Sequence, residues 1–432
     1  AEQAMSESSD TDVTEFDSED LSDTPGAEEG PMTFDPAVAA EHQYLGEMNS
    51  AGWIEPDTES PDSVIPLLPL EGVILFPSQT LPLTLSRWQA GIAERILARE
   101  ERAQSLGIVR LTYDGQDVSV ANIGTAAQLV SVRSLRDGGM HLIAKGRHRF
   151  RILAVHNDPS GLRASVAVLK DEHGPTFPPS QMLHCKTGYP ARLLSLPPQI
   201  TADLALPSPT LRRKVLSGCR SLTSHPVWVM RAFDLVELAQ RGKQLVTEIL
   251  CGQFSAAPDD EAHLFMPSDP RVFAWWLPAN LPVSDENRQA LLEIDSSVVR
   301  LRDCIRLLYE FNSLRCVGCH ADIATRDEIF AMSADGLVSA YVNPAGHVHE
   351  IVNLRNASNI RVVGSSSTEH SWFPGFSWTI AICARCGAHL GWRFSATRRH
   401  LSPTTFWGLR RAALVHQRGG ENAEESVEGA VT

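Results

Sequence analysis

The chain has 432 residues, enough for two or three domains, and 43% of them are hydrophobic, as is ordinary for globular proteins. Its net charge of −14 is confined to one end: residues 1–60 hold seventeen Asp or Glu and no Lys or Arg, leaving 35 acidic and 38 basic residues elsewhere. A body so close to neutral argues against nucleic acid as a direct partner, because nucleic-acid binding needs a basic surface.

Residues 1–60 are predicted to be a disordered acidic tail, since their few apolar side chains cannot offset the entropy lost on ordering. Serines in this tail are candidate phosphorylation sites. We expect no membrane span, because no run of about eighteen apolar residues occurs. No secretory signal is visible at the N-terminus, and eight cysteines are too few for a disulfide scaffold. These features favour a reducing location, in the cytoplasm and nucleus.

A mostly β domain is predicted over residues 61–180. Residues 64–85 are apolar but contain four prolines, which is typical of short strands with proline at edges and turns. A helix is expected around residues 89–101, and further strands at residues 127–132, 141–144 and 150–155.

One strand-like run in this domain carries four cations at period two, namely Lys145, Arg147, Arg149 and Arg151. Such a run can contact a nucleic-acid backbone or cover a solvated strand face. Isolated charge runs are usually solvated, so we favour the solvated face.

Residues 181–312 are predicted to be helical, with apolar residues at helical spacing in residues 226–239 and 241–250. The clearest stripe lies within residues 285–311, at Leu291, Ile294, Val298, Leu301, Ile305 and Leu308. Core packing explains this stripe better than a partner groove does. Nearby prolines place Trp275 and Trp276 in an expected surface loop.

Residues 313–415 return to a β pattern, and residues 416–432 form a second short acidic tail. The predicted fold class is therefore a multidomain α+β protein, with a disordered acidic tail, a mostly β domain, a helical insertion and a C-terminal β domain.

The strongest chemical signal is a pair of Cys-x-x-Cys motifs, formed by Cys316 with Cys319 and by Cys383 with Cys386. Each tight turn can hold two thiolates about 2.3 Å from a metal, so the four sulfurs suit one tetrahedral Zn²⁺. Four protein ligands leave no open position, which makes this zinc structural. Two unrelated cysteine pairs are disfavoured by the spacing, and redox use by the lack of a βαβ context.

Residues beside these motifs fit a metal site. Gly318 and Gly387 give the turns backbone freedom, and Arg315 and Arg385 can offset the negative charge of four thiolates around zinc. The remaining cysteines are expected to be buried apolar residues: Cys185, Cys219, Cys251 and Cys304.

Large aromatic residues flank the second motif, namely Trp372, Trp378, Trp392 and Phe394. Such residues can simply form the core of a small β domain. Because two of them surround a Pro-Gly turn, we favour an aromatic box at the surface. Glu369 lies just outside this box, so a neutral flat ring suits it better than a cation. Backbone groups on a strand from His370 to Trp372 are expected to orient the ring.

No catalytic pattern emerges. The chain has no glycine-rich phosphate loop, no G-x-S-x-G and no H-E-x-x-H. A sulfoxide reductase would need a reactive cysteine near the aromatic box, yet no cysteine follows Cys386. We therefore expect a binding protein rather than an enzyme.

Two regions resemble known families. The stretches YVNPAGHVHE, SSTEHSWFPGFSWTIAICARCGAHLGWRF and SPTTFWGLRRAAL resemble the thalidomide-binding (CULT) domain of the cereblon family, a zinc-bound β-tent. VIPLLPLEGVILFPSQTLPLTL and GRHRFRIL are similar to the substrate-binding N-domain of Lon proteases, the other half of that family's architecture. HQYLG, between tail and body, also matches the family. No ATPase module or Ser-Lys protease follows, so proteolysis is not implied.

This resemblance implies a substrate receptor of a cullin–RING E3 ubiquitin ligase, presenting target proteins for ubiquitination and proteasomal degradation. The helical region would dock on the three-propeller DNA-damage-binding adaptor, and the pocket would bind cyclic-imide, glutarimide-like molecules or protein ends. The implied pocket has a tryptophan cage, a phenylalanine floor, main-chain partners and a rim, contributed by Trp372, Trp378, Trp392, Phe394, Glu369, His370, Ser371, Asn343 and Pro344.

Two positions depart from the family. Ala345 stands where His is frequent, and Ile380 where Val is frequent; either affects which proteins are recruited, since one methyl group can clash. Two other functions stay open on the sequence: a stand-alone zinc β-domain enzyme acting on small molecules, and a chaperone-like adaptor using the Lon-type domain.

Overall fold

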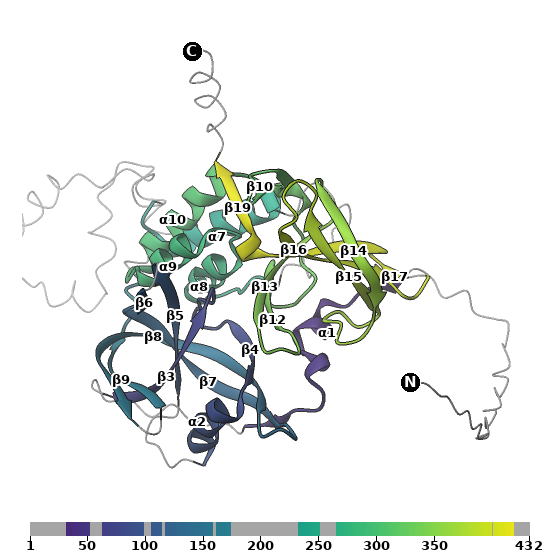
Figure 1. Ribbon diagram of the computed structural model, residues 1–432. Coiled ribbons are helices and arrows are strands. Elements are labelled where there is room, and N and C mark those ends of the chain that lie inside the picture. The colour runs from purple at the N-terminus through teal and green to yellow at the C-terminus, as the bar shows by residue number, and fades with distance from the viewer. Residues whose placement is uncertain are drawn as a thin grey trace, which may run out of the picture.

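The computed structural model describes residues 32–51, 63–98, 105–114, 117–158, 161–173, 232–250, 265–399 and 401–418. These residues form a β barrel, a group of helices and a C-terminal β domain, packed together (Figure 1). The predicted acidic tails lie largely outside the described residues, as do Cys185, Cys219 and Cys251. None of the described helices is long and apolar enough to cross a membrane.

The first part is a sheet that closes on itself. In the pairing order β7-β5-β3-β9-β8 the last strand pairs again with β7, so these five strands form a barrel around an apolar interior. Its elements are β2 (Asn49–Ser50), β3 (Ser63–Glu71), β4 (Thr80–Leu85), α2 (Arg87–Leu97), β5 (Leu106–Asp114), β6 (Asp117–Val120), β7 (Ile123–Ser134), β8 (Met140–Asp158) and β9 (Gly161–Leu169). The predicted mostly β domain is thus confirmed.

Several predicted elements differ in extent. The strands expected at residues 141–144 and 150–155 are parts of the single strand β8. Helix α2 begins two residues before the expected start, because Ser86 and Gln89 form a capping box.

The prolines at positions 66 and 69 lie in β3, which pairs with β9 on one side and β5 on the other, and not in an edge strand. Residues 63–66 pair with β9 and residues 67–71 with β5. Pro66 and Pro69 are therefore each paired on one side within the described sheet, where a missing N–H is tolerated.

The prediction that the four cations of residues 145–151 form a solvated face is wrong for one of them. Arg149 is buried, whereas the other three are exposed or partly exposed. Its guanidinium donates to the Leu292 carbonyl at 2.9 Å and pairs with Asp171 at 3.0 Å. These partners compensate the burial of its charge and join the barrel to the helices.

The helical part comprises α7 (Leu235–Leu245), η3 (Val246–Leu250), α8 (Pro270–Asn280), α9 (Asp285–Glu293) and α10 (Ser297–Glu310). The single helix expected at residues 285–311 is broken, because the Ser296 side chain accepts from the Val299 amide and begins a new helix. Its stripe packs in the core as predicted, with buried Leu291, Val298, Leu301 and Leu308.

The surface loop expected at Trp275 and Trp276 is also wrong, because both residues lie in α8. Asp269 caps this helix and Pro270 occupies its first turn, where proline is favoured. Trp275 is buried, and the Arg300 guanidinium carbon lies 3.2 Å from its ring centroid.

The C-terminal part contains a three-stranded sheet, β11-β10-β19, and a six-stranded sheet, β12-β13-β18-β16-β15-β14. The strands are β10 (Phe311–Cys316), β11 (Asp322–Thr325), β12 (Val338–Val342), β13 (Val348–Leu354), β14 (Ile360–Ser367), β15 (Phe376–Cys383), β16 (His389–Ala396), β17 (Leu401–Ser402), β18 (Thr405–Arg410) and β19 (Leu414–Arg418).

The tail predicted over residues 1–60 is wrong for residues 32–51, which bridge the two β domains. This segment contains β1 (Met32–Thr33), which pairs with β17, and α1 (Pro36–Ala40). The Phe34 ring packs 5.4 Å from that of Phe376, and the Tyr44 hydroxyl accepts from the Val342 amide at 3.1 Å. β2 then pairs with β7 of the barrel.

A substitution of His42 tests this attachment. His42 is buried beside Tyr341, and burial lowers its pKa to about 4 from the usual 6.5. Between those pH values the unfolded chain binds a proton that the folded chain does not, so the free energy of unfolding falls as the pH drops through that window. From pH 7.5 to 5.5 we expect a loss of about 1 kcal/mol.

His42→Asn should flatten this pH dependence in urea unfolding, because Asn tolerates the left-handed backbone at this position and does not titrate. The exposed residue His156 provides a matched control, and His156→Asn should leave the dependence as it is. Equal pH dependence in wild type and His42→Asn would contradict the assignment.

Candidate zinc centre and aromatic cavity

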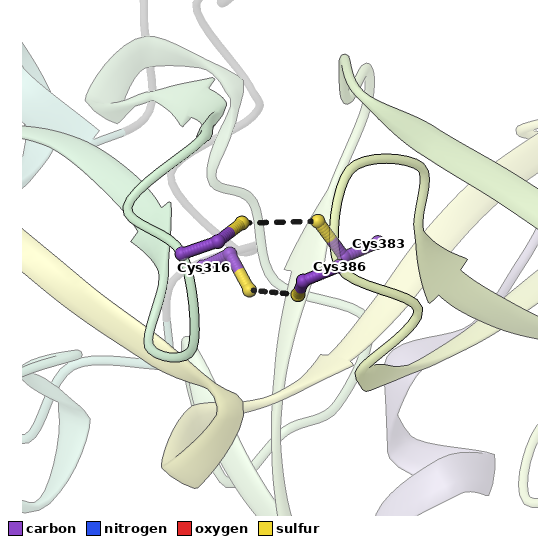
Figure 2. Close-up of side chains that lie close together, drawn as sticks. Cys316, Cys383 and Cys386 are labelled. Atoms are coloured by element: carbon purple, nitrogen blue, oxygen red, sulfur yellow. Dashed lines mark hydrogen bonds between the residues drawn. The ribbon is translucent and has the colours of Figure 1, made fainter.

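Two turns bring the four predicted cysteines together. Cys316 ends β10 and Cys383 ends β15, and Cys319 and Cys386 follow in the turns. The sulfurs face one another across the gap between the turns (Figure 2), and all four lie within 4.8 Å of one another. The Sγ atoms of Cys316 and Cys386 are 3.7 Å apart, and those of Cys319 and Cys383 are 3.5 Å apart.

These distances fit a tetrahedral metal. Zinc with Zn–S bonds of about 2.3 Å requires sulfurs about 3.8 Å apart. Four thiolates fill such a site, so it holds one structural zinc ion and leaves no position for a substrate, as predicted. Gly387 has a φ of 75°, the left-handed backbone expected of it, whereas in the first turn His320 rather than Gly318 has positive φ.

The two arginines beside the motifs differ in their surroundings. The Arg385 guanidinium donates to the Cys319 carbonyl at 3.3 Å, so its charge lies next to the thiolates. Arg315 forms an ion pair with Asp322 at 2.6 Å. Asp322 therefore neutralises the positive charge that was expected to offset the four thiolates. Cys304 is buried, as predicted, and lies outside the cluster.

Metal analysis tests this centre. Purified protein should contain one zinc per chain, and Cys383→Ser should lose it, because three thiolates hold the ion more weakly. The melting temperature should fall by roughly 10 °C, on the scale of 2–4 °C per kcal/mol. Cys304→Ala is the matched control and should retain its zinc. Full zinc occupancy in Cys383→Ser would contradict the four-cysteine site.

A cavity of about 320 Å³ opens along β15 and β16, the two strands joined by the second cysteine turn. Its described lining residues are Asn343, Pro344, Glu369, His370, Trp372, Trp378, Ile380, His389, Trp392 and Phe394. Eight of the nine ligand-binding candidates from the sequence lie in this lining. Ser371 does not: it lines a neighbouring cavity, and its hydroxyl donates to the Phe373 carbonyl. His389 was not predicted, although its position three residues after Cys386 places it at the start of β16.

The aromatic residues form both the cavity wall and a core. Trp372 is buried and stacks on Tyr341, with ring centroids 5.1 Å apart, and Phe394 is buried against Phe406. Trp378 and Trp392 are half-buried. The core and the box that the sequence left as alternatives therefore coexist.

The strand expected from His370 to Trp372 is a turn instead. His370 has a φ of 53°, and the Ser371 amide donates to the Thr368 carbonyl. Trp378 fastens this turn, because its indole Nε1 donates to the Glu369 carbonyl at 2.8 Å. Two residues of the turn, Glu369 and His370, border the cavity.

The cavity is close to neutral. Among its described lining residues Glu369 is the one carboxylic acid, and its side chain is largely exposed. His349 packs against Trp392 behind the wall, and burial, together with the charge of Arg410, lowers its pKa to about 4. Burial lowers the pKa of His389 as well. These imidazoles favour the neutral form near pH 7.

Two known protein families match this chain. Residues 64–310 match the family described as the ATP-dependent protease La (LON) substrate-binding domain, and residues 312–429 match the family described as Yippee zinc-binding/DNA-binding/Mis18, centromere assembly. The solved structure of a Lon N-terminal domain protein from Xanthomonas campestris is 16% identical in sequence. The match covers 56% of this chain and 98% of that protein, with a TM-score of 0.31.

Whole-length relatives agree with these matches. Protein cereblon of Danio rerio is 35% identical over 410 residues, covering 92% of this chain and 91% of that protein. Protein cereblon of Gallus gallus is 34% identical over 394 residues, covering 89% and 85%. The chain therefore belongs to the cereblon family.

Proposed function

We propose that this protein is the substrate-recognition subunit of a cullin–RING E3 ubiquitin ligase, and that its aromatic cavity binds cyclic-imide molecules or protein ends. Family membership supports the receptor role. The observation that carries the ligand assignment is the 320 Å³ cavity lined by three indoles, by residues of a turn and by a single exposed acid.

The chemistry of an imide suits this cavity. A glutarimide ring is neutral, nearly flat and presents one N–H donor between two carbonyl acceptors. Trp378, Trp392 and Trp372 offer ring faces and edges, and the turn around His370 offers peptide groups. The volume lies at the lower end of the range for small-molecule pockets, as expected for one ring.

The arrangement favours binding over catalysis. Of the described cysteines, four face one another in the zinc cluster and Cys304 is buried in the helical core. The cavity lining contains no cysteine, so the described site lacks the thiol that a sulfoxide reductase needs. Ubiquitin transfer belongs to the other subunits of the proposed ligase.

One residue in the cavity lining and one beside it would influence which proteins are recruited. Ile380 lines the cavity and is 38% exposed, and Ala345 is exposed beside Pro344 on the rim. A branched side chain at the first position and a small one at the second alter the surface that surrounds a bound ring.

A thermal-shift titration of the full chain with a glutarimide compound such as thalidomide tests the cavity. At a free ligand concentration one hundred times its Kd, the ligand should stabilise the native state by about 2.7 kcal/mol. Trp378→Ala should abolish the shift, because it removes one wall and releases the Glu369 turn.

Trp88→Ala is the matched control, since Trp88 is 66% exposed on α2 and lies outside the cavity. The control should keep the full shift. A shift that persists in Trp378→Ala, or that vanishes in Trp88→Ala, would argue against a ring bound in this cavity.

We propose that the helical part docks on the three-propeller adaptor of the ligase, in the cytoplasm and nucleus. Its helices expose apolar side chains at their first turns, with Val236 41% exposed on α7 and Val299 45% exposed on α10. Because α7 and α10 pack against each other, these side chains offer apolar surface on neighbouring helices to a partner.

Charge substitutions test this docking without weakening the helices, because acidic residues are favoured in a first turn. Val236→Asp combined with Val299→Asp should reduce co-purification of the adaptor about tenfold or more. Val118→Asp, at a 61% exposed site on β6, should have no effect. Unchanged adaptor recovery with the double variant would contradict docking through these helix ends.

A further inference from the structure

A second cavity, of about 710 Å³, lies on the barrel, and the proposed function does not use it. Its described walls come from β2, β7 and β8 and from the turn before β4. It shares no described lining residue with the aromatic cavity.

The lining of this cavity is basic. Lys145, Arg147 and His148 border it, and no acidic residue is among its described lining residues. Lys145 is exposed and senses the charge of Asp335, a carboxyl whose pKa burial raises to about 6. Arg147 forms no ion pair with another residue of the described part of the chain. The charges of Lys145 and Arg147 thus border a cavity whose described lining contains no acid, and Asp335, outside the lining, lies close enough to interact with Lys145.

The backbone holds these cations in place. The Gly146 amide donates to the Gln79 carbonyl at 2.9 Å, and the Ser78 amide donates to the Gly146 carbonyl at 2.8 Å. A Cβ on Gly146 would lie 2.2 Å from the Phe76 carbonyl oxygen, so β8 approaches this turn too closely for any side chain there. Lys145 and Arg147 therefore flank a pinned point of the strand.

The same chain supplies a complementary anion. Residues 1–31 contain eleven Asp or Glu and no Lys or Arg. They are joined at Met32 to the bridging segment, whose far end contributes Ser50 to the cavity lining. A random coil of 31 residues has a root-mean-square span of about 30 Å, and a compact protein of 432 residues has a radius of gyration of about 22 Å.

We propose that the cavity between β2, β7 and β8 is an anion site that binds the carboxylate-rich residues 1–31 of this chain. Tethering gives those carboxylates a millimolar effective concentration at the site. The attraction is between charges near the surface, so salt weakens it, with a Debye length of about 3 Å at 1 M salt.

Zero-length carbodiimide cross-linking of the full chain, read by mass spectrometry, tests this site. The reagent joins a carboxylate to a lysine amine as an amide, taking up the water that is lost, and the chain has only five lysines. Links from residues 1–31 should favour Lys145 over the exposed Lys170 by about tenfold. The preference should disappear at 1 M salt.

Arg147→Glu should also abolish the preference, because it reverses a charge in the cavity and leaves Lys145 available. Arg151→Glu is the matched control: Arg151 is exposed on the same strand outside the cavity lining, and its reversal should preserve the preference. Equal linkage of Lys145 and Lys170 in wild type would overturn the site. Links between chains in an equal mixture of ¹⁴N- and ¹⁵N-labelled protein would overturn the tethered occupant.

Discussion

Glu350, on β13, accepts hydrogen bonds from Arg288 of α9 at 2.7 Å and from Arg411 at 2.8 Å, in the buried space where the three parts meet. Arg288 also donates to the Ile74 carbonyl of the barrel, and Arg411 to the Gly72 carbonyl. Burial lowers the pKa of Arg288 to about 10, so it stays charged near neutrality. Removing one partner of such a cluster leaves an uncompensated buried charge, which costs about 3–5 kcal/mol. The packing of barrel, helices and C-terminal sheet against one another therefore depends on this cluster.

That packing reaches the rim of the aromatic cavity. β4 of the barrel packs on β12, which leads directly into the turn beginning at Asn343. The Gly346 amide closes the turn on the Asn343 carbonyl, and a Cβ at Gly346 would lie 3.5 Å from the Thr84 carbonyl of β4. One side of the turn thus borders the cavity while the other contacts the barrel. The turn is therefore a direct physical connection between the cavity lining and the barrel.

Features set by local pattern were predictable from the sequence, and those set by distant partners were not. The cysteine spacing predicted the zinc centre, because four thiolates at two turns have few other uses. The burial of Arg149 depends on Leu292, 143 residues away, and no local signal marks it. The docking of residues 32–51 depends on Phe34 entering an aromatic core built by the C-terminal strands. Like residues 1–31, residues 32–51 contain Asp and Glu but no Lys or Arg, so composition alone does not mark the start of the folded part.

The zinc centre and the aromatic cavity share the strands β15 and β16: the turn between them supplies two of the four zinc ligands, and the strands supply two tryptophans of the cavity. In β15, Trp378 lies five residues before the ligand Cys383, and Trp392 of β16 lies six residues after the ligand Cys386. The two strands pair along this stretch, with Ile380 opposite Trp392. Trp372, fixed by stacking on Tyr341, contacts Trp392 edge to face at a centroid distance of 4.7 Å. Rings held in this way would lose little freedom on binding the proposed ligand, so under that proposal the metal would act by holding the walls in place rather than by touching the ligand.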